Sequence, residues 1–490
     1  MAHHWRIKLS RELSRELSRE LSHQTRPKAL SMKQNLPRRL LLAASATATA
    51  LWLVACASPQ IVNGQMPIVF VHGNGDSAAL WQTTLWRFES NGWPRERLHA
   101  INLPLPSARD DDTVAQAGRS STTEHAKFLA SEVDAVLAST GAKQVALVGN
   151  SRGGNAIRNY IQNFGGADKV SHAVLGGTPN HGVLALANLR PNGEFNGAGP
   201  FLIGLNAPKG AQGDEVTPGV RWMTIRSDNN DIFAQPEGTW LGMRGQATNV
   251  TFEGPALKGA TNVVLPARDH REVSYHPEAF AQTYAFITGK APATTAVVAQ
   301  SSVVLEGLIS GIGAGGANNL PLAGATLEVF AVNPATGARL GAAQYSKTVG
   351  ADGRWGPLTT DTTTRHEFVV SAAGYAILHV YRSAFPRSSK LVHFRAERVQ
   401  DGDKDAASVV SFTRPRAYFG LPRDRIVFDG IEPAPGIPTG VAGLAVSKLK
   451  LRDTLRPVVA QFESGVVRET LVGVAWPTAH NHLTVLELQD

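Results

Sequence analysis

The pattern of apolar and polar positions changes near residue 290 of this 490-residue chain. From residue 65 to about residue 290, short apolar runs alternate with longer stretches in which apolar side chains recur every three or four positions. Short runs of this kind are typical of buried strands, and the longer stretches are typical of amphipathic helices. Their alternation predicts a parallel sheet covered by helices on both faces, and thus an α/β domain over 65–290.

Five strands and three helices are expected within this domain. The expected strands cover 67–71, 145–148, 172–175, 221–227 and 262–265. The expected helices cover 123–137, 155–164 and 277–287, with Thr123 as a candidate N-cap of the first.

Residues 183–219 separate two of these strands with a long segment rich in Gly, Pro and Asn, which carries an apolar patch over 201–205. A segment of this length without a strong pattern is uncommon inside a compact domain and is often functional. We expect it to form a cap or lid over the site; an ordinary surface excursion is the alternative.

After a linker over 291–300, the pattern changes to many short alternating runs separated by turn residues. This alternation predicts an all-β, sandwich-like region over 301–490. We expect a β-sandwich over 301–400. Residues 401–490 are expected to form either a further β domain or a continuation of the first.

The net charge of +8 belongs to the N-terminal segment. Residues 1–55 contain ten Lys and Arg and three Glu, whereas the rest of the chain has 38 basic and 37 acidic residues. The expected domains therefore lack the basic excess that nucleic-acid binding requires. Nucleic acid is not an expected partner.

Residues 32–55 have the three parts of a bacterial signal peptide. Basic residues precede an apolar run over 40–54, which is shorter than the ~20 residues of a membrane-spanning helix. The run ends at the single cysteine, Cys56. Residues 53–56 resemble a lipobox, which would make Cys56 the lipidated first residue of a mature lipoprotein.

We therefore expect the protein to be exported. No acidic residue directly follows Cys56, which by the same resemblance favours a lipid anchor in the outer membrane. A periplasmic or secreted protein is the alternative. Translation is expected to begin at Met32, so that residues 1–31 would be a leader assigned in error. One cysteine also excludes an intrachain disulfide and a zinc site built on cysteines.

The strongest chemical signal lies at residues 149–153, which read Gly-Asn-Ser-Arg-Gly. This G-x-S-x-G pattern follows an expected strand and precedes an expected helix, the context in which it forms a nucleophile elbow. The turn is tight, so Gly149 and Gly153 supply the small residues that it needs. Ser151 is the predicted nucleophile; a structural turn is the alternative.

A serine nucleophile needs a base and an acid that orients the base. His270 follows a late strand and is the predicted base, while the competing His276 stands where it would cap a helix. Asp231 follows the strand 221–227 and is the preferred acid, with Asp228 as the alternate. Asp269 is expected to point away from the site.

The oxyanion hole is expected to use two backbone N–H groups. One is that of Arg152, directly after the nucleophile, and the other is that of Asn74, after the strand 67–71. This chemistry requires no cofactor and no metal. The histidines of the β region share no metal-ligand spacing and are interpreted as packing or surface residues: His366, His379 and His393.

These motifs resemble a bacterial α/β-hydrolase of the lipase and esterase type. The residues that carry the resemblance are His72-Gly-Asn-Gly, Gly149-Asn-Ser-Arg-Gly, Gly177-Thr-Pro-Asn and Asp269-His. The two-part layout resembles an archaeal lipase with a C-terminal β domain implicated in lipid binding. Residues 308–373 also look like a transthyretin-like or carboxypeptidase-regulatory sandwich.

The resemblance implies a serine carboxylic-ester hydrolase that forms an acyl-enzyme, with a lipase as the first expectation. Its partners would be a lipid or ester substrate, met at an interface through 301–490, and the outer membrane through the anchor. A polyester depolymerase acting on polyhydroxyalkanoate is one alternative. A surface-anchored binding protein with a non-catalytic hydrolase domain is another.

Overall fold

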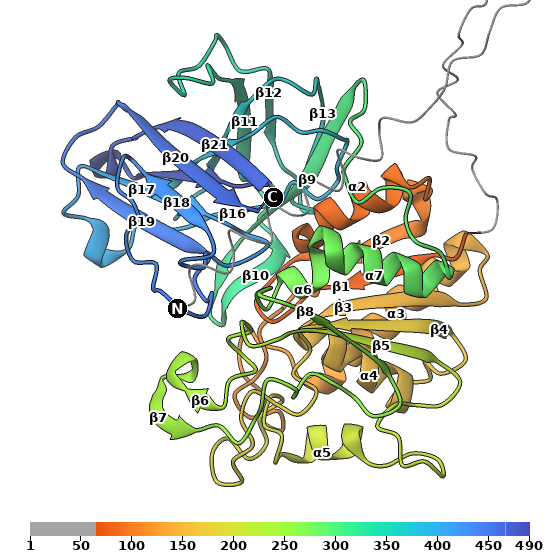
Figure 1. Ribbon diagram of the computed structural model, residues 1–490. Coiled ribbons are helices and arrows are strands. Elements are labelled where there is room, and N and C mark those ends of the chain that lie inside the picture. Colours follow the sequence, from red (N-terminus) through yellow and green to blue (C-terminus); the bar gives the residue numbers. More distant parts are fainter. Residues whose placement is uncertain (1–64, 466) are drawn as a thin grey trace, which may run out of the picture. The chain divides into compact units, whose positions relative to one another are not determined.

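The computed structural model describes residues 65–465 and 467–490 (Figure 1). The expected leader, the signal peptide and Cys56 lie outside the described residues. All described residues belong to one compact unit, Ser58–Asp490. Within the described ranges, no helix has the length and apolar character needed to cross a membrane.

A six-stranded parallel sheet forms the first half of the described chain, in the order β2-β1-β3-β4-β5-β8. Its strands are β1 (Ile68–Val71), β2 (Leu98–Ile101), β3 (Val145–Asn150), β4 (Val170–Gly176), β5 (Arg221–Ser227) and β8 (Thr261–Leu265). The α/β core is thus as predicted. Strand β2 was not predicted, because only its two end residues are buried and it lacks a continuous apolar run.

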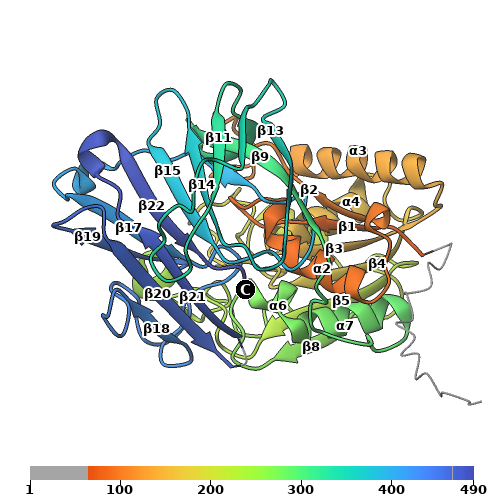
Figure 2. The same ribbon diagram turned by 90° about the horizontal axis from the view of Figure 1, so that it is seen from above.

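Helices cover both faces of this sheet (Figure 2). Their bounds are α2 (Gln82–Ser90), α3 (Thr122–Thr140), α4 (Arg152–Asn163), α5 (Pro200–Asn206), α6 (Glu272–Tyr275) and α7 (Pro277–Thr288), with short 3-10 turns η1 (Ala78–Trp81) and η2 (Arg95–Arg97). Side chains alternate along each strand, so Phe70 packs with α2 and α7 while Val71 packs with α3 and α4.

The start of α3 differs from the expectation. Ser121, and not Thr123, is the N-cap: its hydroxyl accepts from Glu124 N at 3.1 Å, while the Glu124 carboxylate accepts from Ser121 N at 2.7 Å. This reciprocal capping box satisfies two N–H groups that the helix itself leaves unpaired.

The segment 183–219 is packed against the domain and contains helix α5. The buried guanidinium of Arg158, on α4, donates to Leu205 O at 3.0 Å and to Asn206 Oδ1 at 2.7 Å. A hairpin follows β5 and is made of β6 (Glu237–Gly238), η3 (Thr239–Leu241) and β7 (Met243–Ala247).

The second half of the described chain is all β. One sheet has the order β10-β9-β13 with β16 on β9, a second has the order β12-β11-β14-β15-β22-β17-β19, and a third has the order β18-β20-β21. The first uses β9 (Val303–Gly313), β10 (Gly316–Pro321), β13 (Arg354–Thr360) and β16 (Phe394–Arg395). The second uses β11 (Thr326–Ala331), β12 (Tyr345–Thr348), β14 (His366–Ser371), β15 (Ile377–Arg382), β17 (Ser408–Thr413), β19 (Val446–Leu451) and β22 (His482–Glu487). The third uses β18 (Arg425–Phe428), β20 (Pro457–Ser464) and β21 (Val467–Val474).

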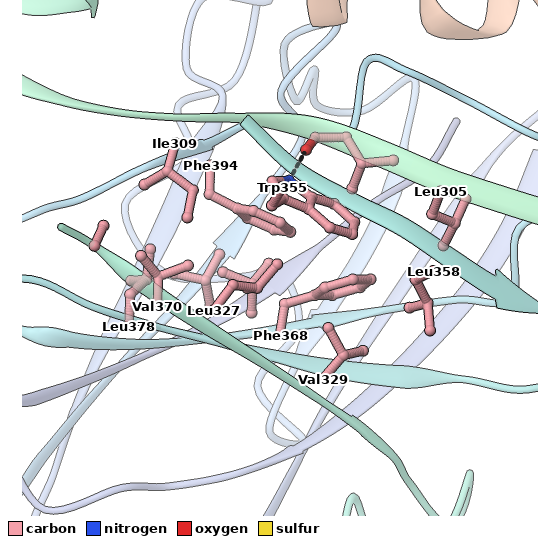
Figure 3. Packing of buried hydrophobic residues seen from close by; sticks show 14 of the residues in the cluster. Leu305, Ile309, Leu327, Val329, Trp355, Leu358, Phe368, Val370, Leu378 and Phe394 are labelled. Atoms are coloured by element: carbon pink, nitrogen blue, oxygen red, sulfur yellow. Dashed lines mark hydrogen bonds between the residues drawn. The ribbon is translucent and has the colours of Figure 1, made fainter. Parts of the chain in front are cut away.

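The first two sheets share a buried core (Figure 3). Trp355 lies at its centre, where its indole N–H donates to Val392 O at 2.9 Å and its ring packs against Phe368 and Phe394. Strand β22 lies between β15 and β17 and is parallel to both, so residues 301–400 and 401–490 contribute to a single sheet.

The β region also packs on the α/β domain. Trp86 of α2 belongs to the core cluster of the β region, and its indole N–H donates to Ser388 O at 2.8 Å. The expected linker is held on α2 as well, since Arg87 Nε donates to Thr295 O at 3.0 Å and Asn91 Nδ2 to Thr294 O at 2.8 Å.

Candidate active site

Ser151 stands at a sharp turn between β3 and α4. Its backbone has φ 52° and ψ −124°, a strained conformation for a residue other than glycine. The turn is locked on both sides, because a Cβ at Gly149 would lie 2.8 Å from Gly154 N and a Cβ at Gly153 would lie 2.4 Å from Val71 O. The geometry is that of a nucleophile elbow.

The loop after β8 carries His270, and the loop after β5 carries Asp231. His270 Nδ1 lies 2.8 Å from Asp231 Oδ1 and 2.9 Å from Oδ2, and both side chains are buried. Asp231 Oδ1 also accepts from Phe233 N at 2.8 Å, and the Phe233 ring packs edge-on against the imidazole. This pair fixes the orientation of the imidazole.

The other acid candidates lie elsewhere. Asp228 Oδ1 accepts from Asn229 N at 2.7 Å and from Ala267 N at 3.0 Å. Although its partial burial acts in the opposite direction, these bonds lower the pKa of Asp228. Asp269 is buried and accepts from Tyr418 N at 2.9 Å. The carboxylate on His270 is therefore that of Asp231.

The competing His276 and two further histidines, His72 and His181, hold loops. His276 Nδ1 accepts from Glu278 N at 3.3 Å and caps α7. Burial, followed by the nearby Arg268, lowers the pKa of His276 to about 4, so the ring is a neutral acceptor near pH 7. His72 Nε2 accepts from Leu103 N at 3.1 Å, and His181 Nδ1 bonds Gly254 O at 2.7 Å.

Ser151 and His270 line one cavity of about 280 Å³. The hydrogen bonds of the described residues include none between Ser151 Oγ and the His270 ring; such a bond often tightens only in the enzyme–substrate complex. Asn74 also lines this cavity, and Arg152 N follows Ser151 at the start of α4. The apolar part of the wall includes Val183, Leu184, Phe195, Phe233, Leu241 and Tyr418.

The side chain of Arg152 joins the elbow to the segment 183–219. Its Nε donates to Glu194 Oε2 at 2.7 Å in a fully buried ion pair, and its Nη2 donates to Ser120 O at 2.7 Å. Burial raises the pKa of Glu194, and Arg152 opposes that shift. The sequence singled out Arg152 for its backbone N–H only, and its side chain holds the cavity wall.

Asn150 is a further residue of the site that sequence reasoning missed. Its side-chain Nδ2 donates to Ser274 Oγ at 2.8 Å and to His270 O at 3.2 Å. The residue before the nucleophile thus ties the elbow to the backbone of His270. Its position inside the G-x-S-x-G pattern was the available signal.

The β region supplies a second unexpected part of the site. The connection between β17 and β18 places Tyr418 in the cavity wall. In the same connection, Arg414 Nη2 donates to Glu272 Oε1 at 2.9 Å and Arg423 Nη1 to Glu272 Oε2 at 2.6 Å. Burial and the neighbouring Glu272 raise the pKa of the adjoining Asp269. The residues that flank His270 are therefore held by side chains and backbone of the β region.

Comparison with known proteins agrees with this architecture. Residues 65–191 match the family model described as Lipase (class 2), and residues 301–399 match the Lipase C-terminal domain. Among solved structures, the chain is similar to Aspergillus fumigatus lipase B at 18% identity and a TM-score of 0.34, over 48% of this chain and 55% of the fungal chain.

Two bacterial structures are matched over more of this chain. One is Bacillus licheniformis lipase BlEst2 in its propeptide form, at 14% identity and a TM-score of 0.34, over 84% of this chain and 93% of that one. The other is phospholipase PlaB from Legionella pneumophila, at 15% identity and a TM-score of 0.32, over 68% and 94%.

The two family matches fall on the two halves of the described chain, with the elbow in the first and the sandwich in the second. Residues 65–191 are therefore similar to a class 2 lipase and residues 301–399 to a lipase C-terminal domain. Together with the α/β core, these two matches support a carboxylic-ester hydrolase of the lipase and esterase type.

Proposed function

We propose that this hydrolase cleaves acyl esters with Ser151 as nucleophile, His270 as general base and Asp231 as the group that orients His270. The observation that carries the proposal is the buried Asp231–His270 pair, whose histidine lines the same cavity as a serine held on a strained elbow. Nucleophile, acid and base follow one another in this order along the chain, which is the order of α/β-hydrolases.

The proposed reaction has two steps. His270 takes the proton of Ser151 Oγ as that oxygen attacks the ester carbonyl, and Asp231 stabilises the imidazolium that forms. The N–H groups of Asn74 and Arg152 receive the developing oxyanion. His270 then protonates the leaving alcohol, and a water molecule activated by His270 releases the acid from Ser151.

The cavity wall favours an acyl chain as the substrate part nearest the serine. Its apolar side chains come from the segment 183–219, from the loop after β5 and its hairpin, and from the β region. Burial of CH₂ groups against such a wall is favourable by about 0.8 kcal/mol each. We therefore propose a lipase-type acyl ester as the substrate class.

A p-nitrophenyl ester series from acetate to palmitate tests both parts. The full chain should hydrolyse these esters, and Ser151→Ala should lower kcat by at least about 10³-fold. Ser139→Ala, on the exposed side of α3, is the matched control and should keep full activity. A rate that rises with chain length would support a lipase, whereas undiminished activity of Ser151→Ala would refute the proposed nucleophile.

A further inference from the structure

A second cavity, of about 500 Å³, lies where the α/β domain meets the β region. The α/β domain contributes residues of the segment 75–80 and Arg271. The β region contributes strands β9, β10, β15, β16, β17, β19 and β22 and connections between strands. Asp76 and Arg271 line this cavity and the catalytic cavity alike. The proposed function makes no use of this second cavity.

Cationic side chains predominate in its wall. The cations are Arg271, Arg382, Arg395, Arg416 and Lys448, and the carboxylates are Asp76, Glu397 and Glu487. Three of the cations are paired: Arg271 with Asp76, Arg382 with Glu487, and Lys448 with Asp403. In the described ranges, no carboxylate oxygen lies within 4.0 Å of Arg395 or Arg416.

Of these two cations, Arg416 has the larger desolvation cost, because this residue is only 2% exposed. Its Nη2 donates to Gln82 Oε1 at 2.7 Å and its Nη1 to Leu488 O at 3.4 Å, while its Nε has no hydrogen-bond partner. Neutral acceptors compensate a buried charge only in part, and the carboxylate of Glu469 acts on Arg416 from beyond ion-pair distance. A buried ion without an ion-pair partner destabilises the fold.

Arg395 repeats this arrangement across the same cavity wall. Its donors reach neutral acceptors only, namely Asn319 Oδ1 at 3.0 Å, Asn318 O at 3.3 Å and Gly75 O at 3.5 Å. His393 lies in the same wall. Burial lowers its pKa, and the positive charges of Arg354, Arg382 and Arg395 add to this effect, so that the pKa of His393 is about 3. The histidine therefore stays neutral. Asp76 and Glu397 act on Arg395 from beyond ion-pair distance, so this guanidinium has charged neighbours in the wall but no ion-pair partner among the described residues.

We propose that this cavity is a binding site for an oxyanion, a carboxylate or phosphate group held by Arg416 and Arg395. The planar guanidinium fork matches both groups and forms strong charge-assisted hydrogen bonds with them. Apolar side chains in the same wall fit an apolar body attached to the anion: Leu80, Leu308, Leu378, Val380 and Phe394. The ligand is then either a free inorganic anion or the head of an amphiphilic acid.

Thermal unfolding of the full chain with added anions tests the proposal without reference to activity. Wild type, Arg416→Gln and Arg425→Gln are compared in sodium phosphate, in sodium octanoate and in sodium chloride of equal ionic strength. Arg425 is the matched control because it is exposed and its partners, Glu432 and Glu463, are surface residues. A ligand that binds only the folded chain raises the melting temperature.

The expected result is a rise of a few degrees for wild type and Arg425→Gln, with phosphate or with octanoate, and none for Arg416→Gln. Without an added anion, Arg416→Gln should melt no lower than wild type, because it removes a buried charge that has no ion-pair partner. A response to phosphate identifies an inorganic anion, and a response to octanoate alone identifies an amphiphilic acid. An equal response of all three proteins, or no response of wild type to either anion, overturns the proposal.

Discussion

Ser151 and His270 face the same cavity, but different parts of the chain hold them. The elbow at Ser151 is built from its near neighbours Gly149 and Gly153 and from the adjacent strands of one sheet. The loop of His270 depends on Arg414, which is 142 residues from its partner Glu272 along the chain. The conformation of the proposed nucleophile is thus a local property, whereas the position of the proposed base is a property of the whole tertiary structure.

The buried charges at the His270 loop explain why the difference matters. Glu272 and Asp269 are almost fully buried, and the guanidinium groups of Arg414 and Arg423 compensate them. Removing one partner of a buried ion pair leaves the other charge buried and uncompensated. A change in the β region should therefore disturb the proposed base, His270, more than the proposed nucleophile, Ser151.

Removal of all residues after Ala291 tests this comparison with the largest expected effect. The truncated chain would leave Asp269 and Glu272 without their arginines, and would expose Trp86, which packs in the core of the β region. We expect turnover of soluble p-nitrophenyl acetate to fall below detection, together with hydrolysis of emulsions. Full activity on the soluble ester with loss on emulsions alone would instead assign the β region to substrate docking only.

Gly153→Ala should disturb the elbow alone. The added Cβ would meet Val71 O at 2.4 Å and His72 O at 2.7 Å, which are backbone atoms that cannot move aside cheaply. A displacement of the serine by about 1 Å can cost about 100-fold in kcat. Gly204→Ala, in α5 with nothing within 4 Å of the new Cβ, is the control and should leave the ester assay unchanged.

Arg414→Met should disturb the His270 side alone. The guanidinium is buried and pairs with Glu272 and with Asp490 Oδ2 at 2.6 Å, so its loss should lower the free energy of unfolding by about 3–5 kcal/mol. A displaced base lowers kcat while substrate binding persists, so we expect about a tenfold loss in kcat, or ~1.4 kcal/mol, with KM little changed. Chemical denaturation and steady-state kinetics measure the two effects. An unchanged kcat would show that the β region stabilises the loop without positioning His270.

The smallest expected effect concerns pH. Because the pKa of Asp269 is raised in the folded protein, the folded chain retains a proton that the unfolded chain releases above about pH 4. The unfolded state then binds fewer protons, so this group makes stability decline as pH rises through that window. Asp269→Asn should flatten the decline in unfolding experiments between pH 4 and pH 7; an identical slope in the variant would contradict the shifted pKa.

Local features of the site were predictable from the sequence, and distant ones were not. The elbow was predictable because one run of residues contains its strand, its small residues and its helix. His270 and Asp231 were predictable because chain order and strand ends place them. Tyr418 and Arg414 carry no local signal, since their role comes from packing against a loop more than 140 residues away.

The same distinction applies to the fold. The α/β core and the β-rich region were predictable from their hydrophobic periodicities. The position of β22 in its sheet was not predictable, because a pattern of alternating residues predicts a strand but does not predict which strands it pairs with. The division of the β region at residue 400 likewise does not follow a boundary between sheets, since one sheet takes strands from both sides of it.

The place of β22 bears on the order of folding. Before residues 482–487 join the sheet, β15 and β17 present unpaired edges, and such edges are the usual starting points of aggregation. Pairings between segments about 100 residues apart also form slowly, because the loop between them must close first. The connection that carries Tyr418 and Arg414 begins at β17, so the environment of His270 is completed only when this strand is in place. We therefore expect the chain to gain its hydrolytic capacity at a late stage of folding, when β22 has closed the sheet.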